Sequence, residues 1–275
     1  MVAIKCSVVF AVLFHSSRVD DVMRRIKMSQ KDQVIEALAR NGGYATFSEL
    51  NRIVDCSGWG TKTPFASIRR IVQTNPGDFY RIRPGQWGLV SKKDEIERYR
   101  LKDGDNNDTH GYYQGVIVEL GNLKEDLGEI SNKQKPVDTY VPPQDKNRRY
   151  SHARLGDIVT MSDIVPFTGE KILRRAKTVD VIWFNMRNMP IAFFEIEHST
   201  DMQNSLDKYI ELQDFHAKFY IVSDEANHRR FDDFMKYSRY DEIKSRVKFM
   251  AYDRLARYHT YKMESAIRSA ELLGE

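Results

Sequence analysis

The spacing of apolar residues predicts three helices followed by a β-hairpin over residues 28–91. Apolar side chains recur at helical intervals in residues 30–40, and the polar and glycine-rich stretch 41–43 ends that helix. Thr46 and Glu49 form a capping-box pattern, which opens a second helix.

A third helix is predicted to begin at Thr63 and Pro64, because threonine caps helix N-termini and proline is favoured at the first helical position. Its apolar stripe consists of Phe65, Ile68, Ile71 and Val72. Two strand-like stretches then flank Pro84 and Gly85, which is a hairpin signal. Three helices followed by a hairpin is the element order of a winged helix-turn-helix domain.

The second half of the chain alternates strand-like and helical stretches. Its β-branched and aromatic blocks predict strands, and apolar residues at helical spacing predict the helices between them. The predicted strands are residues 178–185, 191–199, 218–224 and 247–253, and the predicted helices are residues 112–130, 205–215, 227–240 and the tail from about residue 261. We therefore predict a two-domain protein of α+β or α/β class, in which a mixed sheet flanked by helices follows the winged helix.

Composition suggests where the domains end. Residues 92–110 are charged and finish in DGDNNDTH, which is typical of a linker with a short helix at its start. The second domain then covers residues 111–275. The apolar run within residues 1–27 is too short to span a bilayer, and no cleavage site follows it. We interpret this N-terminal extension as lying upstream of the true start, near Met28, or as a dispensable arm.

The overall composition is that of a globular intracellular protein. Of the 275 residues, 41% are hydrophobic and 11% are aromatic, which is enough for a real core. The two cysteines, Cys6 and Cys56, form neither a CxxC pair nor a zinc-binding cluster. This usage favours a reducing compartment, so we expect a cytoplasmic protein with no membrane association.

The positive charge is concentrated in one stretch. Between Thr61 and Val90, five basic residues accompany a single acid, Asp78, so this stretch carries the whole net charge of +4. A local basic patch suits a polyanion such as double-stranded DNA better than a membrane.

Three acids are expected to converge in the second half. Glu195 and Glu197 lie on one face of the apolar strand IAFFEIEHS, where unpaired carboxylates would be costly to bury. Folding the preceding strand back through its loop brings Asp180 within one residue of both, and an offset of one residue places it on their face. Oxygen ligands of this kind suit Mg²⁺ or Mn²⁺. The alternative is that the three acids form surface ion pairs with nearby arginines.

The arrangement of Asp180 before Glu195-x-Glu197 on a hairpin resembles the PD-(D/E)xK nuclease superfamily, which includes many restriction endonucleases. The resemblance covers roughly residues 111–255 and implies a metal-dependent nuclease whose mixed sheet, flanked by helices, has the restriction-endonuclease-like fold. Val179 stands where the motif has proline, and Glu197 stands where it usually has lysine. Some restriction enzymes of the superfamily also carry glutamate at the second position.

The resemblance implies further site residues. The first helix of the family often supplies another acid, here Glu119. Lys208, on the helix after the motif, is the candidate cation in place of the motif lysine, and Lys177 is a second candidate. For either lysine the alternative is a solvated surface charge. His198 is expected to pack behind the strand rather than to bind a metal.

The first half, through GGYATFSEL, GTKTPFASIRRIVQ and FYRIRPGQWGL, resembles the HARE-HTH winged-helix domain found in chromatin proteins and fused to restriction endonucleases. This resemblance implies a sensor of DNA sequence or cytosine modification. We expect polar residues on the third helix and the hairpin to contact DNA. These candidates are Lys62, Ser67, Arg69, Arg70, Gln73, Arg81 and Arg83. The alternative is a winged helix that binds protein.

These features together predict a metal-dependent DNA endonuclease of the type II restriction class, in its most specific form sensitive to cytosine modification. Asp180, Glu195 and Glu197 would bind Mg²⁺, or Mn²⁺ in its place, and Glu119 and Lys208 would complete the catalytic set. Cutting both strands predicts a homodimer on DNA. The alternatives are a non-enzymatic DNA-binding regulator with a degenerate nuclease fold and an RNA-processing nuclease, which suits a winged helix less well.

Overall fold

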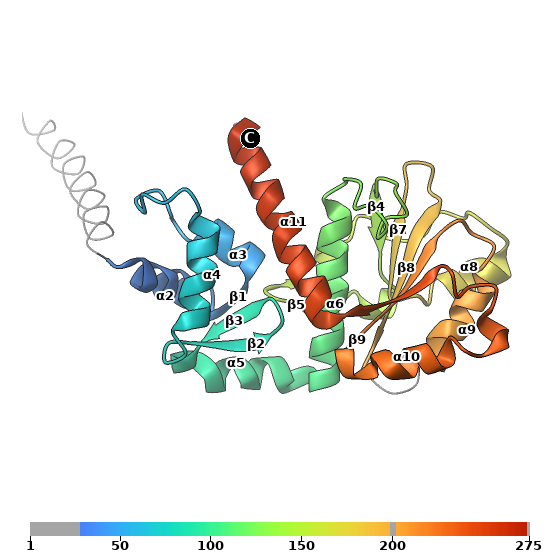
Figure 1. Ribbon diagram of the computed structural model, residues 1–275, viewed down its shortest axis with the longest axis horizontal. Helices are drawn as coiled ribbons and strands as arrows, with labels where there is room; N and C mark the ends of the chain where they lie inside the picture. The colour runs from blue at the N-terminus through green and yellow to red at the C-terminus, as the bar shows by residue number, and fades with distance from the viewer. Residues whose placement is uncertain (1–27, 199–201, 274–275) are drawn as a thin grey trace, which may run out of the picture. The chain divides into compact units, whose positions relative to one another are not determined.

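The computed structural model describes residues 28–198 and 202–273 (Figure 1). The chain divides into two compact units, one ending at Ile96 and the other beginning at Glu97. The N-terminal extension predicted over residues 1–27 lies outside the described residues. Among the described helices, none is both long enough and apolar enough to cross a bilayer.

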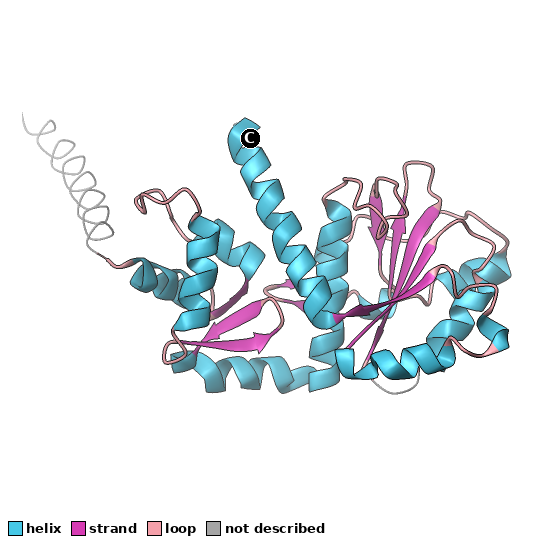
Figure 2. Cartoon of the chain, in the orientation of Figure 1, coloured by secondary structure: helices cyan, strands magenta, loops and turns pink. Residues whose placement is uncertain are grey.

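The first unit combines α-helices with a three-stranded antiparallel sheet (Figure 2). Its elements are α2 (Gln30–Arg40), β1 (Tyr44–Thr46), α3 (Phe47–Ile53), α4 (Pro64–Thr74), β2 (Phe79–Arg83), β3 (Gln86–Leu89) and the 3₁₀ turn η1 (Val90–Lys92). The strand order is β1-β3-β2. The predicted succession of three helices and a hairpin is confirmed, and β1 adds a strand that the sequence pattern did not indicate.

The helix-start signals of this unit are confirmed in part. The Thr46 hydroxyl accepts a hydrogen bond from the Glu49 backbone N–H at 3.1 Å, and the Glu49 carboxylate accepts one from the Thr46 N–H at 2.7 Å. Pro64 is the first residue of α4, but the Thr63 side chain makes no capping bond. Its backbone, with φ −133° and ψ 60°, departs from the extended conformation that lets a threonine cap a helix. All residues of the predicted α4 stripe are buried.

The second unit is built on a five-stranded mixed sheet with the order β10-β9-β8-β7-β4. β8, β9 and β10 run parallel, while β7 pairs antiparallel with both β8 and β4. The strands are β4 (Asp138–Tyr140), β7 (Val181–Phe184), β8 (Pro190–Glu197), β9 (Lys218–Ser223) and β10 (Val247–Ala251), and a separate ribbon pairs β5 (Arg149–Tyr150) with β6 (Ala153–Arg154).

Helices cover both faces of this sheet (Figures 1 and 2). Apolar side chains of α6 and α11 share a core with one face, and those of α8 and α9 share a core with the other. The remaining elements are α5 (Lys93–Arg100), α6 (Asp105–Asn122), α7 (Leu155–Ile158), α8 (Glu170–Ala176), α9 (Gln203–Glu211), α10 (His228–Phe234), α11 (Tyr252–Leu273) and the 3₁₀ turns η2 (Leu101–Asp103), η3 (Pro143–Asp145), η4 (Glu225–Asn227) and η5 (Ser238–Tyr240).

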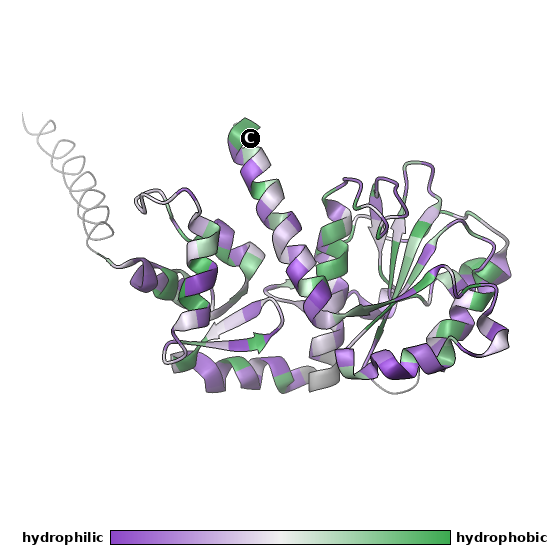
Figure 3. Cartoon of the chain, in the orientation of Figure 1, coloured by the Kyte–Doolittle hydropathy of each residue, from purple (hydrophilic) through white to green (hydrophobic). Residues whose placement is uncertain are grey.

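The central strands carry many hydrophobic residues (Figure 3), and these residues pack on both faces of the sheet. In β7, Val181 and Trp183 pack toward α6, while Ile182 and Phe184 pack toward α9. Burying each such side chain contributes about 1.5–3 kcal/mol. A strand enclosed in this way has no face turned to water, so a carboxylate on it must find its partner inside the protein.

Two sequence predictions at the ends of the second unit are wrong. The short helix expected at the start of residues 92–110 is present as α5, but η2 and the start of α6 stand where the linker was expected. The charged residues of α5 are compatible with a helix, and Ile96 is buried and anchors it. The final helix begins at Tyr252 and not near residue 261, because Tyr252 and Leu255 already pack in the core as part of its inner face.

Glycines in α6 allow β5 to approach the helix closely. A Cβ at Gly115 would lie 2.1 Å from the Tyr150 ring, and one at Gly111 would lie 2.7 Å from the Arg149 carbonyl oxygen. The two glycines are four residues apart and therefore line the same face of the helix.

Gly115→Ala is expected to destabilise the protein, although alanine favours helices by about 1 kcal/mol over glycine. Overpacking in a core costs about 1–3 kcal/mol, and a 2.1 Å contact with a ring belongs at the upper end of that range. Urea unfolding would measure the change. Gly169→Ala is the matched control, because nothing lies within 4 Å of its Cβ position. Equal stability of the two variants would contradict this packing.

Candidate active site

A β-bulge places Asp180 opposite Glu195. Phe184 pairs with Pro190 beside the hairpin turn. Moving away from the turn, the register is shifted by one residue from Trp183 back to Val181, so that Val181 pairs with Phe194. One step further along, Asp180 faces Glu195, and Asp180 Oδ2 accepts a hydrogen bond from the Ile196 backbone N–H at 2.7 Å. The one-residue offset that the sequence analysis required is therefore present.

Glu195 is buried and paired with a lysine. Its side chain is 4% exposed, and Lys208 Nζ from α9 donates to its two oxygens at 2.9 and 2.7 Å. The same ammonium donates to the Thr178 carbonyl at 3.0 Å, and the Ser205 hydroxyl donates to Glu195 Oε2 at 3.1 Å. Burial, and then the charge of Asp180, raise the pKa of Glu195 well above its usual value, while Lys208 opposes them.

Glu197 lies next to the same serine. The Ser205 oxygen also lies within hydrogen-bonding distance of Glu197 Oε1, so one side chain of α9 connects the two glutamates, and its single proton is donated to one of them at a time. Burial raises the pKa of Glu197, the hydrogen bond from Ser205 lowers it, and the charge of Asp180 raises it further. The group therefore holds a proton more readily than an exposed glutamate does.

Asp145 joins this region from outside the hairpin. It is buried at the end of η3, where its Oδ2 accepts from Gln114 Nε2 at 2.8 Å and its Oδ1 accepts from Arg148 Nε at 2.6 Å. Gln114 also donates to the Asp180 carbonyl at 3.0 Å. Ligand atoms of His110, Asp145 and Asp180 all lie within 4.8 Å of one another.

Sequence analysis missed Asp145, His110, Gln114 and Ser205 as site residues. Asp145 follows two prolines in a stretch without periodicity, and His110 closes the segment that was interpreted as a linker. Only the three-dimensional packing of α6 and η3 against β7 brings these residues together. Ser205 had a weak signal, because it lies one turn before Lys208 on the same predicted helix.

Two predicted residues lie elsewhere. Glu119 accepts from the Tyr150 hydroxyl at 2.6 Å and lies 2.7 Å from His259 Nε2. It is nine residues along α6 from His110, roughly 13 Å at the helical rise, so the structure does not bring it to Asp180. Lys177 pairs with Asp163 at 2.8 Å near the surface.

His198 follows the glutamate pair but has a partner outside it. Its Nδ1 lies 2.9 Å from the Tyr252 hydroxyl, which also donates to the Glu197 carbonyl at 3.0 Å. Its ring centroid lies 5.5 Å from that of His110. These contacts attach the end of β8 to the start of α11.

The predicted DNA-contact residues of the first unit differ in exposure. Lys62, Arg70, Gln73 and Arg81 are exposed, whereas Ser67 and Arg69 are half-buried. Arg83 is buried, which departs from the prediction of two exposed arginines on the hairpin. A register shift between residues 81 and 83 is the physical reason, because it breaks the alternation that would put both side chains on one face.

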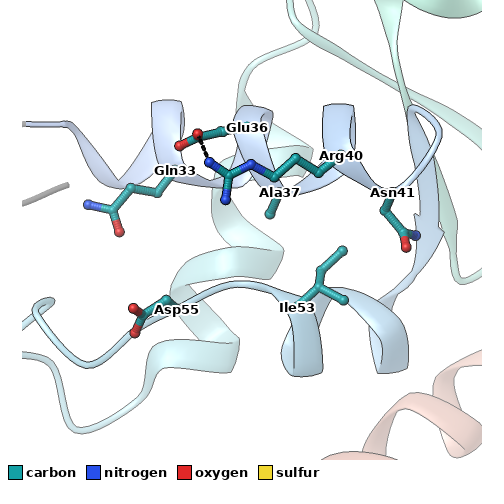
Figure 4. A pocket seen from close by; sticks show the side chains of 7 residues that line it. All are labelled: Gln33, Glu36, Ala37, Arg40, Asn41, Ile53 and Asp55. Atoms are coloured by element: carbon teal, nitrogen blue, oxygen red, sulfur yellow. Dashed lines mark hydrogen bonds and ion pairs between the residues drawn. The ribbon is translucent and has the colours of Figure 1, made fainter. Parts of the chain in front are cut away.

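The first unit also contains a pocket of about 400 Å³ between α2, α3 and the loop after α3 (Figure 4). It is lined by Gln33, Glu36, Ala37, Arg40, Asn41, Ile53 and Asp55. Glu36 and Arg40 already neutralise each other by an ion pair (Figure 4). This pocket contains none of the candidate catalytic or DNA-contact residues.

Comparison with protein families gives the class of the second unit: it is a domain of the type II restriction enzyme class. Residues 95–271 match the family described as the type II restriction enzyme NmeDI C-terminal domain. This match covers more than half of the chain, and the chain belongs to that family. Neither the curated proteins nor the solved structures compared with the chain gave a match.

Lys208→Met is expected to lower the free energy of unfolding at pH 8 by about 3–5 kcal/mol, because it leaves the buried Glu195 carboxylate without its cation. The loss should shrink as the pH falls, since Glu195 can then bind a proton. The double variant Glu195→Gln, Lys208→Met removes both charges and should recover most of the stability. Denaturant unfolding at two pH values measures this, and a fully stable Lys208→Met variant at pH 8 would contradict a buried ion pair.

Proposed function

We propose that the protein is a Mg²⁺-dependent endodeoxyribonuclease of the PD-(D/E)xK type. The observation that supports this most strongly is the position of Asp180 opposite Glu195 on an enclosed hairpin, within a domain of a restriction enzyme family. A hairpin that served only structure would have no use for several carboxylates at one end of its core.

The donor set fits a hard divalent cation. Asp180, Glu195 and Glu197 offer carboxylate oxygens, which Mg²⁺ and Mn²⁺ prefer. Asp180 Oδ2 is held by the Ile196 N–H, which leaves Oδ1 for a ligand. Bound Mg²⁺ would supply charge neutralisation for a scissile phosphate and a lowered pKa for a coordinated water.

The remaining catalytic roles would fall to side chains of the protein: Lys208, Glu197 and Ser205. Lys208 stabilises the ionised form of the buried Glu195 and would supply the positive charge that the motif lysine carries in related nucleases. Glu197, with its raised pKa, accepts the proton of the attacking water, and Ser205 orients it. The water oxygen forms the new P–O bond as one ester P–O bond of the phosphodiester breaks, and the leaving sugar oxygen takes a proton from solvent water.

The first unit would act as the DNA reader. Its element order supports a winged helix of the HARE-HTH kind, with α4 as the recognition helix and the β2–β3 hairpin as the wing. Lys62, Arg70 and Gln73 on or beside α4, and Arg81 on the wing, are exposed for contact with duplex DNA. Cytosine modification at the recognised site is the property that this unit would sense.

Double-strand cleavage requires one cut in each DNA strand. We propose a homodimer on DNA, which is the simplest symmetric way to supply two active sites. The exposed Leu272 and Leu273 at the end of α11 are consistent with a contact to a second chain. The competing function is a regulator that binds DNA without cutting it, and the glutamate at position 197 is the feature that favours it.

Asp180→Asn and Glu195→Gln are each expected to reduce Mg²⁺-dependent cleavage by a factor of about 10³ or more while binding to duplex DNA persists, because each removes a charge that the transition state needs. Plasmid cleavage and gel-shift assays on the same preparations give the two readouts. Asp163→Asn, which alters a surface carboxylate paired with Lys177, is the matched control. Wild-type cleavage by Asp180→Asn would show that the site is assigned wrongly.

The double variant Lys62→Ala, Arg70→Ala should weaken duplex binding. It should also make the slope of log affinity against log salt shallower by about one for each DNA phosphate that the protein no longer neutralises. Binding is measured on the full chain in an Asp180→Asn background, which prevents cutting. Arg52→Ala removes an equally exposed charge from α3 and serves as control. An unchanged affinity in the double variant would favour a protein-binding role for the first unit.

A further inference from the structure

We propose that His110, Asp145 and Asp180 form the divalent-cation site of the second unit, and that Glu195 acts as the lysine-bound partner beside it. The inference deepens the proposed function and rests on it. It changes the ligand set, because two of the three residues lie outside the hairpin motif.

The three residues lie close enough together to share one cation. One ligand atom from each of the three residues lies within 4.8 Å of the other two. Two ligands on opposite sides of a cation with bonds of about 2.1 Å lie roughly 4.2 Å apart, so small side-chain shifts suffice. The three residues come from α6, η3 and the residue before β7, which are fixed to one another by core packing and by the bonds of Gln114.

The carboxylates differ in the partners from which their oxygens accept hydrogen bonds. Both oxygens of Glu195 accept hydrogen bonds from Lys208, and one also accepts from Ser205. Asp145 is held by Gln114 and Arg148, and Asp180 by the Ile196 N–H, in the way that hydrogen bonds commonly orient metal-binding carboxylates. These bonds hold both aspartates in place, and none of the side chains that make them is a basic residue paired with both carboxylates.

Two α6 side chains carry a buried polar atom that makes no hydrogen bond within the described part of the chain. His110 Nε2 is buried 3.3 Å from Asp180 Oδ1 and makes none. Gln114, one helical turn further along α6, is fully buried, and its Oε1 accepts none although its Nε2 donates to Asp145 and to the Asp180 carbonyl. Buried polar atoms nearly always have partners, and a hydrated cation beside these residues would provide them.

The formal charges around these residues do not cancel. Asp145, Asp180, Glu195 and Glu197 contribute four negative charges when ionised, and Arg148 and Lys208 contribute two positive ones. Two negative charges are left without compensation, which is the charge that one divalent cation neutralises. The imidazole nitrogen suits a transition metal better than Mg²⁺, so Mn²⁺ should bind more tightly than Mg²⁺.

The test is Mn²⁺ binding to the full-length protein, measured by calorimetry and by electron spin echo spectroscopy without DNA. Asp145→Asn and His110→Ala are each expected to weaken Mn²⁺ binding about tenfold or more, and the nitrogen modulation from a coordinated histidine should disappear in His110→Ala. Asp163→Asn is the control. Thermal unfolding without metal checks that each variant is folded, and the nitrogen signal of the wild type tests the ligand set even where Asp145→Asn does not fold.

The outcomes separate this inference from the proposed function. Tight Mn²⁺ binding by the wild type without a nitrogen signal, unchanged in both variants and lost in Glu195→Gln, would overturn the inference and leave a nuclease with the metal on the hairpin acids. A wild type that binds no Mn²⁺ and cuts no DNA with Mg²⁺ would overturn both.

Discussion

One extra residue in β8 determines which side chains face Asp180. Ile191 and Ala192 are neighbours, yet both pack into the same core, which is the consequence of a bulge at this point. Without it, the pairing set at the turn would place Asp180 opposite Phe194, on the other face of the strand from the glutamates. Because a shift of one residue exchanges the faces of a whole strand, the convergence of acids depends on this feature.

The charge of these acids then constrains what surrounds them. Glu195 lies inside an apolar sheet, and only the buried ammonium of Lys208 and the hydroxyl of Ser205 make its ionised form tolerable. Asp145 adds a fourth carboxylate, held by Arg148 and Gln114. When its four carboxylates are ionised, the cluster is negative, so its chemistry follows from the need for further positive charge, whether from a cation or from a substrate held by one.

The sequence predicted those parts of the fold that depend on local patterns. The capping box at Thr46, the apolar stripe of α4 and the central strands were confirmed because periodicity and caps act over a few residues. Asp180 and the glutamates could be paired because a short hairpin links them. Asp145 and His110 could not be found, because their proximity to Asp180 depends on packing between distant segments. Glu119 was implied by the resemblance, in which the first helix often supplies an acid, and α6 carries it away from the cluster.

The most direct test of the central claim is the incubation of the full-length protein with unmethylated and cytosine-methylated plasmid, in Mg²⁺ and in EDTA. A metal-dependent restriction endonuclease should give site-specific double-strand cleavage in Mg²⁺ in at least one modification state and none in EDTA. Binding of duplex DNA without cleavage in either state, with Mg²⁺ or Mn²⁺ present, would contradict that claim and identify the acid cluster as the remnant of a nuclease site in a DNA-binding regulator.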